Sequence, residues 1–578
     1  MTITHKSFSF FYSSILKKTG YVVSILLLTC TLVFCVFYLS HDYQQLKTWY
    51  LSLNDCFYNA DIWATHFFTS TTKQKGNTLA IVGSILSVLL IIYLIFSWQR
   101  YNKWGGKEDS FIQLNGAGWY FAVAGITLVS GIISWRLTAP AYDEVFSAVN
   151  CAELHPLQTI SYYMLPNNHL YFNFLNNVLF SWYHDPVSTG RFLSLVAYIG
   201  VALCAFHWLQ QLMGNRFFAL LAVIPVALQF ITWGLGAQAR GYELQLLCAW
   251  GAFLTIIYYL QTPNNRLLRL NALFCIVGFS LVSTFLFYYV AQTIVVVSSM
   301  AYRRQIKPTF LKYQAVIIAM VFLLYLPAFC FSGVSAFTAN RYVTPLAPTW
   351  QAFVPDFFNI VKYFINCCFS MLCGEDRTIN FILFFLPLSL FFFKNKRDRS
   401  IAFFYTVLWL TYIFISLYMR RYSFTRNMAI HYSITMAIVV YTLFRIVEAT
   451  ATLVSEKRRP IIETAFFLLP MLAYGVFLGI TDKRDAPFLI YYNNVNSIYD
   501  GLVKGLEFIP TDASVSFSQE SFYPYYLLRN NHPNAHRCSS GNETYYIKRN
   551  YEPLPLGREN DYIKVKDGPE DYEFYKKK

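Results

Sequence analysis

Residues 118–146 read GWYFAVAGITLVSGIISWRLTAPAYDEVF, an apolar run that ends directly in a pair of acidic residues. The run 118–136 has the length of about 20 apolar residues that a membrane-spanning helix needs. A polar segment, 138–185, follows it and carries Asp143 and Glu144 together with several histidines and asparagines. Charged groups at a membrane interface are costly unless they serve a function. The stretch therefore predicts a polytopic membrane protein with a functional loop at the membrane surface.

The composition of the whole chain supports this interpretation. Of its 578 residues, 56% are hydrophobic and 13% are charged, whereas soluble proteins carry about 25% charged residues. Aromatic residues make up 19%, as expected where Tyr and Trp line the membrane interface. The net charge of +15 does not indicate a nucleic-acid partner, because the basic residues fall in short loops between apolar runs.

Apolar runs of spanning length divide the rest of the chain into about thirteen transmembrane helices. The candidate spans are 20–40, 79–98, 118–136, 192–212, 217–233, 243–260, 269–283, 285–300, 313–332, 379–393, 401–418, 428–447 and 461–480. The segment 269–300 fits either one long broken helix or two short spans. Basic residues gather in alternate loops, which predicts a cytoplasmic N-terminus and, with an odd number of spans, an outward C-terminus.

The predicted fold is an all-α polytopic membrane protein with a small C-terminal extracytoplasmic α/β domain. Residues 1–117 form an N-terminal region with two additional transmembrane helices. Residues 118–480 form the transmembrane core, with an outward loop at 137–191. Residues 481–578 alternate short apolar runs with turn residues and carry nearly balanced charge, which predicts the soluble domain.

The outward loop supplies the first candidate for chemistry. Adjacent residues of a helix point about 100° apart, so Asp143 and Glu144 cannot both face one pocket. We predict Asp143 as a catalytic base and Glu144 as its supporting partner. A solvated acidic pair at the start of a surface helix remains the alternative.

Arginines in outward loops supply the second candidate. Arg240 stands in a very short outward loop, where it either reaches to the interface or binds an anion. Arg420, Arg421 and Arg426 crowd another short loop on the side where basic residues are scarce, so orientation does not explain them. We predict that these arginines bind the phosphate of a lipid.

These residues resemble motifs of the GT-C glycosyltransferases, in the branch that includes protein O-mannosyltransferases and aminoarabinose transferases acting on lipid A. The segment Tyr142-Asp143-Glu144-Val145 resembles the Asp-Glu of that family's first outward loop. Two further segments resemble its His-Pro-Leu-Tyr and Ala-Arg-x-Tyr-x-Leu patterns, namely Asn168-His169-Leu170-Tyr171 and Ala239-Arg240-Gly241-Tyr242-Glu243-Leu244. The Pro of the first of these patterns is absent here, and two spans precede the loop's own helix where the family usually has none.

The resemblance implies an inverting transfer of a sugar from a polyprenyl-phosphate donor to an extracytoplasmic acceptor. Asp143 would be the base, Arg240 and Arg426 would contact the donor phosphate, and His169 would line the cleft with Asn168 and Tyr242. No cofactor is expected, and no metal, because the chain has no Asp-x-Asp motif.

The expected partners are the lipid-linked donor, membrane lipids and an acceptor that is a glycan, a lipid or a protein. The expected location is a bacterial inner membrane with a periplasmic C-terminus. A lipid-linked sugar transporter or flippase is one alternative function. An oligosaccharide polymerase using the outward loop 333–378 is another, and a non-catalytic scaffold is a third.

Overall fold

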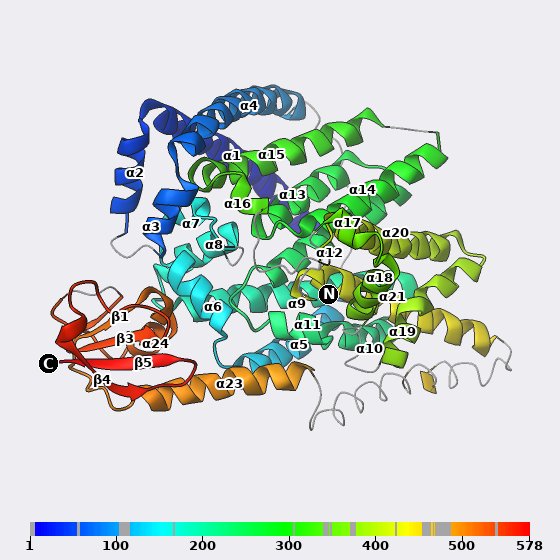
Figure 1. The fold of residues 1–578 in the computed structure, drawn as a ribbon. Helices are drawn as coiled ribbons and strands as arrows, with labels where there is room; N and C mark the ends of the chain where they lie inside the picture. Colours follow the sequence, from blue (N-terminus) through cyan, green and yellow to red (C-terminus); the bar gives the residue numbers. More distant parts are fainter. Residues whose placement is uncertain are drawn as a thin grey trace. The chain divides into compact units, whose positions relative to one another are not determined.

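The computed structural model describes residues 6–54, 58–102, 116–165, 168–304, 307–338, 346, 349–369, 377–421, 425–452, 464–465, 468, 487–537 and 541–578. Figure 1 shows the helices and strands of the chain, coloured along the sequence. By its internal contacts the chain divides into two compact units. The first unit comprises residues 1–118, 160–166 and 318–339, and the second comprises 119–159, 167–317 and 340–578. The division at residues 117 and 480 proposed from the sequence stays a prediction.

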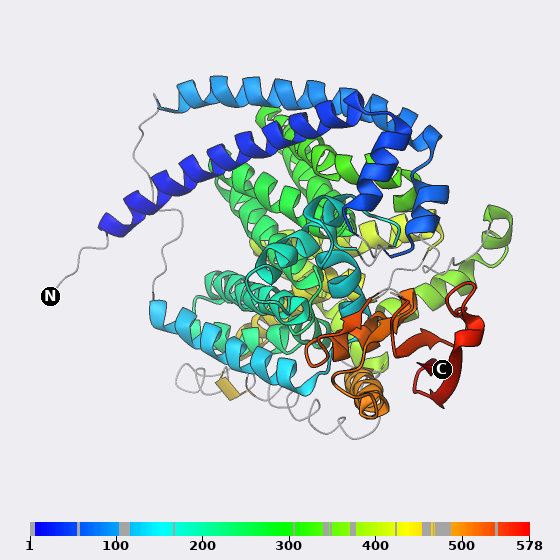
Figure 2. The same ribbon diagram turned by 90° about the vertical axis from the view of Figure 1, so that its left-hand side faces the viewer.

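The first unit is built on two long helices, α1 (Lys6–Ser40) and α4 (Ser70–Asn102), which lie side by side (Figure 2). Three short elements connect them: α2 (Tyr43–Ser52), α3 (Ala60–Ile62) and η1 (Trp63–Phe67). The unit also holds the later part of α15 (Pro308–Ser332) and the short α16 (Ser335–Thr338). The Tyr38 hydroxyl donates to the Cys330 carbonyl at 3.1 Å and the Trp63 indole donates to the Phe331 carbonyl at 3.0 Å, which fastens α15 to this unit.

The second unit begins within α5 (Ala117–Leu137) and contains most of the apolar helices and the polar loop, except its residues 160–166. The loop folds into α6 (Tyr142–Ser147), η2 (Ala148–Ala152), α7 (Pro156–Ser161) and α8 (Leu170–Phe180). The helices that follow are α9 (Pro186–Met213), α10 (Arg216–Ala227), α11 (Phe230–Leu235), α12 (Tyr242–Gln261), α13 (Asn265–Leu281) and α14 (Phe285–Tyr302). After α15 come α17 (Trp350–Phe353), α18 (Phe357–Phe369), α19 (Arg377–Phe385), η3 (Leu386–Phe392), α20 (Lys396–Met419), η4 (Thr425–Met428) and α21 (Ala429–Ala451).

Nine helices in the described ranges are long and apolar enough to cross a membrane. They are Thr19–Ser40, Ser70–Ser97, Ala117–Leu137, Pro186–Met213, Tyr242–Gln261, Phe285–Tyr302, Pro308–Ser332, Lys396–Met419 and Arg426–Ala451. Each of them overlaps one of the thirteen predicted spans. The chain is therefore an integral multi-pass membrane protein.

The other four predicted spans differ in detail. The span 217–233 is split into α10 and α11, and 379–393 is split where Pro387 opens the 3-10 turn η3. The segment 269–300 forms two helices, because α13 ends at Leu281 and α14 starts at Phe285. The span 461–480 lies outside the described residues except at 464–465 and 468, and so do residues 339–345, 347–348 and 370–376 of the loop 333–378.

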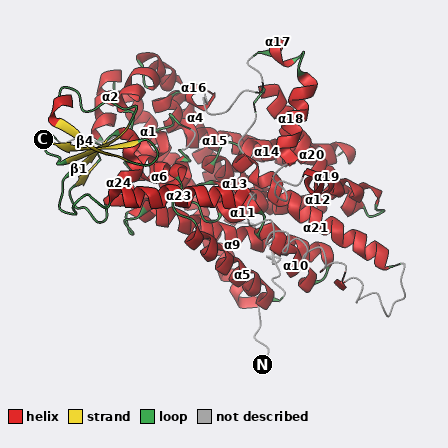
Figure 3. Ribbon diagram, turned by 60° about the horizontal axis from the view of Figure 1, so that its bottom comes forward, coloured by secondary structure: helices red, strands yellow, loops and turns green. Residues whose placement is uncertain are grey.

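The C-terminal region forms the predicted α/β domain. It starts with α23 (Pro487–Leu506) and contains β1 (Val515–Phe517), η6 (Gln519–Ser521), α24 (Phe522–Leu528), β2 (Ala535–His536), β3 (Tyr545–Arg549), η7 (Glu559–Asp561), β4 (Tyr562–Asp567) and β5 (Tyr572–Lys577). The strand order is β2-β1-β3-β5-β4, with β1 parallel to both its neighbours and the other pairs antiparallel. In Figure 3 these strands, drawn in yellow, lie together near the C-terminus.

Candidate active site

Asp143 lies in the first turn of α6, the short helix that starts two residues after Pro140. Its Oδ2 atom is 2.8 Å from Nη1 of Arg240 and 3.1 Å from Nη2 of Arg426. The Asp143 and Arg426 side chains are 32% and 35% exposed, whereas Arg240 is 2% exposed. The structure thus brings this carboxylate together with both guanidinium groups. One negative and two positive charges give the cluster a net positive charge at a partly solvent-accessible position.

Arg240 is held in place by the short loop between α11 and α12. The Ser194 hydroxyl, on α9, donates to the Gln238 carbonyl at 2.5 Å and lies 3.3 Å from the Arg240 carbonyl. The guanidinium lies 5.3 Å from the centre of the Tyr242 ring. These contacts hold the buried Arg240 side chain in place, with its guanidinium group directed at Asp143.

Glu144 has a different environment from Asp143, although the two are neighbours in α6. Its carboxylate is 0% exposed and forms a two-point ion pair with Arg191 of α9, with N···O distances of 2.6 and 2.9 Å. It also accepts hydrogen bonds from the backbone N–H of Ala141 at 3.0 Å and of Ala239 at 2.7 Å. The contacts show a carboxylate that joins α6, α9 and the loop before Arg240. Its role as a supporting partner of Asp143 stays a prediction.

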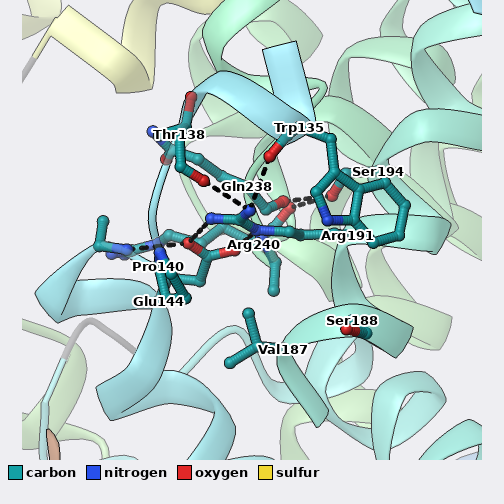
Figure 4. Close-up of polar contacts among 12 residues, drawn as sticks. Trp135, Thr138, Pro140, Glu144, Val187, Ser188, Arg191, Ser194, Gln238 and Arg240 are labelled. Carbon is teal, nitrogen blue, oxygen red and sulfur yellow. Dashed lines mark hydrogen bonds and ion pairs between the residues drawn. The ribbon is translucent and has the colours of Figure 1, made fainter. Parts of the chain in front are cut away.

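Arg191 completes this buried network. Its guanidinium donates to the Thr138 and Ala139 carbonyls at 2.9 and 3.0 Å and to the Trp135 carbonyl at 3.3 Å. Figure 4 shows Arg191 with these contacts around Glu144. The last turn of α5 and the start of the polar loop are thereby tied to α9. Buried charges are tolerated when they are paired and fully hydrogen-bonded, and this pair satisfies both conditions.

His169 lies directly against Arg240, as its predicted place in the cleft requires. Its Nε2 is 3.0 Å from Nη2 of Arg240, and its ring meets the Tyr242 ring edge-on at 4.7 Å. Burial, followed by the charges of Arg240 and Arg426, lowers the pKa of His169 well below its usual value. An imidazole that accepts from a guanidinium is neutral and carries its proton on Nδ1. Nδ1 is buried and has no hydrogen-bond partner among the described residues.

The other predicted residues are placed less directly. The Asn168 amide donates to the Thr159 carbonyl at 3.2 Å and accepts from Asn173 at 2.9 Å, so it shapes the loop. Arg420 ends α20 in the left-handed region (φ 53°), with its guanidinium 5.3 Å from the centre of the Trp350 ring. The Arg421 backbone N–H donates to the Ser416 carbonyl at 3.0 Å. Of the three arginines in that loop, Arg426 is the one that meets Asp143 in an ion pair.

Sequence reasoning gave Glu243 no role. This side chain is 0% exposed, and neither carboxyl oxygen has a hydrogen-bond partner among the described residues. An acidic residue in the first turn of an apolar span was the available signal, since ionisable groups inside membrane helices mark functional sites.

Glu243 lies in the first turn of α12, three residues after Arg240. Farther along the same helix, the Trp250 indole donates to the Ser433 hydroxyl of α21 at 3.0 Å.

The C-terminal domain contacts the segment that carries Asp143. The Tyr523 hydroxyl of α24 donates to the Pro140 carbonyl, and Arg529 forms an ion pair with Glu153. The Asn496 side chain of α23 bridges the Leu137 carbonyl and the Ala139 N–H, each at 2.8 Å. The sequence showed no catalytic constellation in this domain, and its contacts show that it braces both ends of the segment.

A metal requirement is not decided by the side chains. Across the described ranges, no group of three or more His, Cys, Asp or Glu residues could hold a metal ion. The expectation that no metal or other cofactor takes part stays a prediction.

The chain matches no protein-family model and no curated protein. Among solved structures it is similar to the arabinosyltransferase EmbB from Mycobacterium smegmatis, with 11% identity and a TM-score of 0.41 over 74% of this chain and 45% of that chain. It is also similar to ArnT from Cupriavidus metallidurans bound to undecaprenyl phosphate, with 11% identity and a TM-score of 0.45 over 80% of this chain and 98% of that chain.

Proposed function

We propose that the chain is a membrane glycosyltransferase that moves a sugar from a polyprenyl-phosphate donor to an extracytoplasmic acceptor, with inversion at the anomeric carbon. The observation that supports this best is the single carboxylate of Asp143 held between Arg240 and Arg426 at a partly exposed position. A base beside two fixed cations suits a reaction in which a hydroxyl loses a proton while a phosphate gains charge.

In this reaction the acceptor hydroxyl gives its proton to the Asp143 carboxylate. The hydroxyl oxygen forms a bond to the anomeric carbon of the donor sugar. The bond between that carbon and the phosphate oxygen breaks on the opposite face, and the electron pair leaves with the polyprenyl phosphate. Arg240 and Arg426 stabilise the negative charge that this phosphate gains.

The Asp143 carboxylate forms ion pairs with both arginines. Donor phosphate would compete for the guanidinium groups and weaken their hold on the carboxylate. A carboxylate that loses cationic partners becomes a stronger base. Donor binding would therefore activate the base, so that Asp143 accepts a proton most readily when the phosphate is in place.

The substitution Asp143→Asn tests the proposal. It keeps the shape of the side chain and removes the base, and a positioned general base contributes about 10²- to 10⁴-fold to a rate. We expect a loss of that size in proteoliposomes given radiolabelled polyprenyl-phosphate sugars, with an extract of the native membrane's lipids and glycans as acceptor. Binding of undecaprenyl phosphate should persist.

The matched control is Asp512→Asn, because Asp512 is an exposed carboxylate in the C-terminal domain. This variant should transfer sugar at the unaltered rate. Transfer by Asp143→Asn at more than about a tenth of the control rate would assign the base to another residue.

A further inference from the structure

A small pocket lies on the side of α6 that faces the C-terminal domain. It has a volume of about 250 Å³. Its walls come from α6, α23, α24 and the sheet, and three tyrosine rings line it: Tyr142, Tyr523 and Tyr572. Leu502 of α23 is buried in the wall, and the half-buried Ile498 lies nearer the surface.

Two residues of opposite charge, Arg549 and Glu570, line this pocket. The Arg549 guanidinium lies 4.0 Å from the centre of the Tyr572 ring and 5.5 Å from that of Tyr142. It also donates to the Glu570 carbonyl. The guanidinium is therefore held against two aromatic rings of the pocket.

The turn that presents Glu570 has a constrained backbone. Glu570 and Asp571 have φ values of 56° and 61°, the left-handed region that costs a residue with a side chain about 1 kcal/mol or more. The Asn550 N–H donates to the Asp571 carbonyl at 2.8 Å and holds the turn in this form. Such conformations, retained by their surroundings, gather at ligand-binding positions.

The lining favours a neutral ligand with one apolar face and several hydroxyls. Aromatic rings pack against an apolar surface, while a carboxylate and a guanidinium accept from and donate to neighbouring hydroxyls. The volume is below the range of about 300–1,000 Å³ that holds drug-sized ligands. Both features fit a single sugar ring and disfavour a phosphate or an acyl chain.

The pocket and the proposed base share one short helix. Tyr142, in the pocket wall, directly precedes Asp143, and adjacent helical residues project about 100° apart. A ligand in the pocket would therefore lie beside the carboxylate without occupying its place between Arg240 and Arg426.

We propose that this pocket binds a neutral sugar residue of the acceptor, close to the hydroxyl that is glycosylated. The inference rests on the proposed transferase function, and it selects a glycan from the three acceptor classes that the sequence left open. The C-terminal domain then recognises the acceptor, and its contacts with Pro140 and Glu153 keep the recognised sugar in register with Asp143.

The test measures binding in the absence of any donor. The full chain in nanodiscs is mixed with methyl α-mannopyranoside, methyl β-glucopyranoside, methyl β-galactopyranoside or methyl α-arabinofuranoside, and saturation transfer to each glycoside is recorded by NMR. We expect transfer to at least one glycoside. Ile498→Trp fills the pocket and should reduce that signal at least tenfold, and Glu570→Ala should reduce it severalfold. Ser497→Trp places the same ring at an exposed neighbouring position of α23 and should leave the signal unchanged.

The outcomes separate this inference from the proposed function. A signal in no glycoside, or one that persists in Ile498→Trp, overturns the pocket assignment even if Asp143→Asn abolishes sugar transfer. Conversely, Asp143→Asn should bind the glycoside like the unaltered chain. If glycoside binding depends on Ile498 but Asp143→Asn still transfers sugar, the pocket assignment stands and the proposed base is wrong.

Discussion

Two ion-pair clusters begin at neighbouring residues of α6 and differ in almost every physical respect. The Asp143 cluster is partly exposed and contains one carboxylate for two arginines. The Glu144 cluster is buried, pairs one carboxylate with one arginine and makes further hydrogen bonds to backbone groups. In the buried cluster the ion pair is fully hydrogen-bonded, and it holds structural elements together. In the accessible cluster the positive charges outnumber the negative one, so the cluster can still bind an anionic ligand.

The largest expected effect comes from breaking the buried cluster. Glu144→Ala would leave the guanidinium of Arg191 buried without its counter-charge, and removing one partner of a buried pair costs about 3–5 kcal/mol. We expect a large fall in the thermal unfolding temperature of the purified chain. The double variant Glu144→Gln/Arg191→Met removes both charges and should recover part of the loss. If Glu144→Ala unfolds at the unaltered temperature, this network does not hold α6.

The substitution Arg426→Ala tests the accessible cluster. Arg426 is partly exposed, so the fold should tolerate the change. Loss of a hydrogen bond to a charged group costs about 1.5–3 kcal/mol. This corresponds to a roughly 10- to 150-fold weaker affinity for the donor. We expect weaker binding of undecaprenyl phosphate in a flotation assay, with an unchanged unfolding temperature. Arg303→Ala, at an exposed position directly after α14, is the matched control, and an equal loss there would argue against a specific role for Arg426.

Glu243 combines features of both clusters, since it is fully buried like Glu144 but lacks partners among the described residues. An unsatisfied buried polar group costs about 1–3 kcal/mol. Glu243→Met should therefore raise the unfolding temperature and, if the carboxyl serves the reaction, lower sugar transfer. A variant that is more stable and fully active would show that the carboxyl has no part in the reaction.

The smallest expected effect is the pH dependence contributed by His169. Its pKa is lowered in the folded chain, so below about pH 6.5 the unfolded chain binds a proton that the folded chain does not. The free energy of unfolding should not depend on His169 above that pH. Below it, the free energy of unfolding should fall by up to about 1.4 kcal/mol per pH unit. Unfolding measured from pH 7.5 to 5.5 should show this slope, and His169→Gln, which can still accept from Arg240, should flatten it. An identical slope in both would exclude His169 as its source.

The sequence predicted the features that depend on short stretches of the chain. Apolar run length located the nine described spans, and turn residues with alternating apolar positions indicated the C-terminal sheet. Arginines in two short loops, which the predicted membrane orientation does not explain, drew attention to Arg240 and Arg426, and both lie beside Asp143. Pairings between distant residues were not readable. Nothing local to Glu144 shows that its partner is Arg191, and nothing local to the tail shows that Tyr523 reaches Pro140. Such contacts exist only after the helices pack.

The ion pair of Glu144 with Arg191 has a consequence for how the protein is made. Glu144 leaves the ribosome 47 residues before Arg191. Until α9 has been synthesised and inserted, the carboxylate lacks Arg191, the charged partner that makes its burial tolerable. The loop after α5 must therefore stay hydrated during this interval. The Asp143 cluster is completed later still, because Arg240 and Arg426 both follow α9 in the chain.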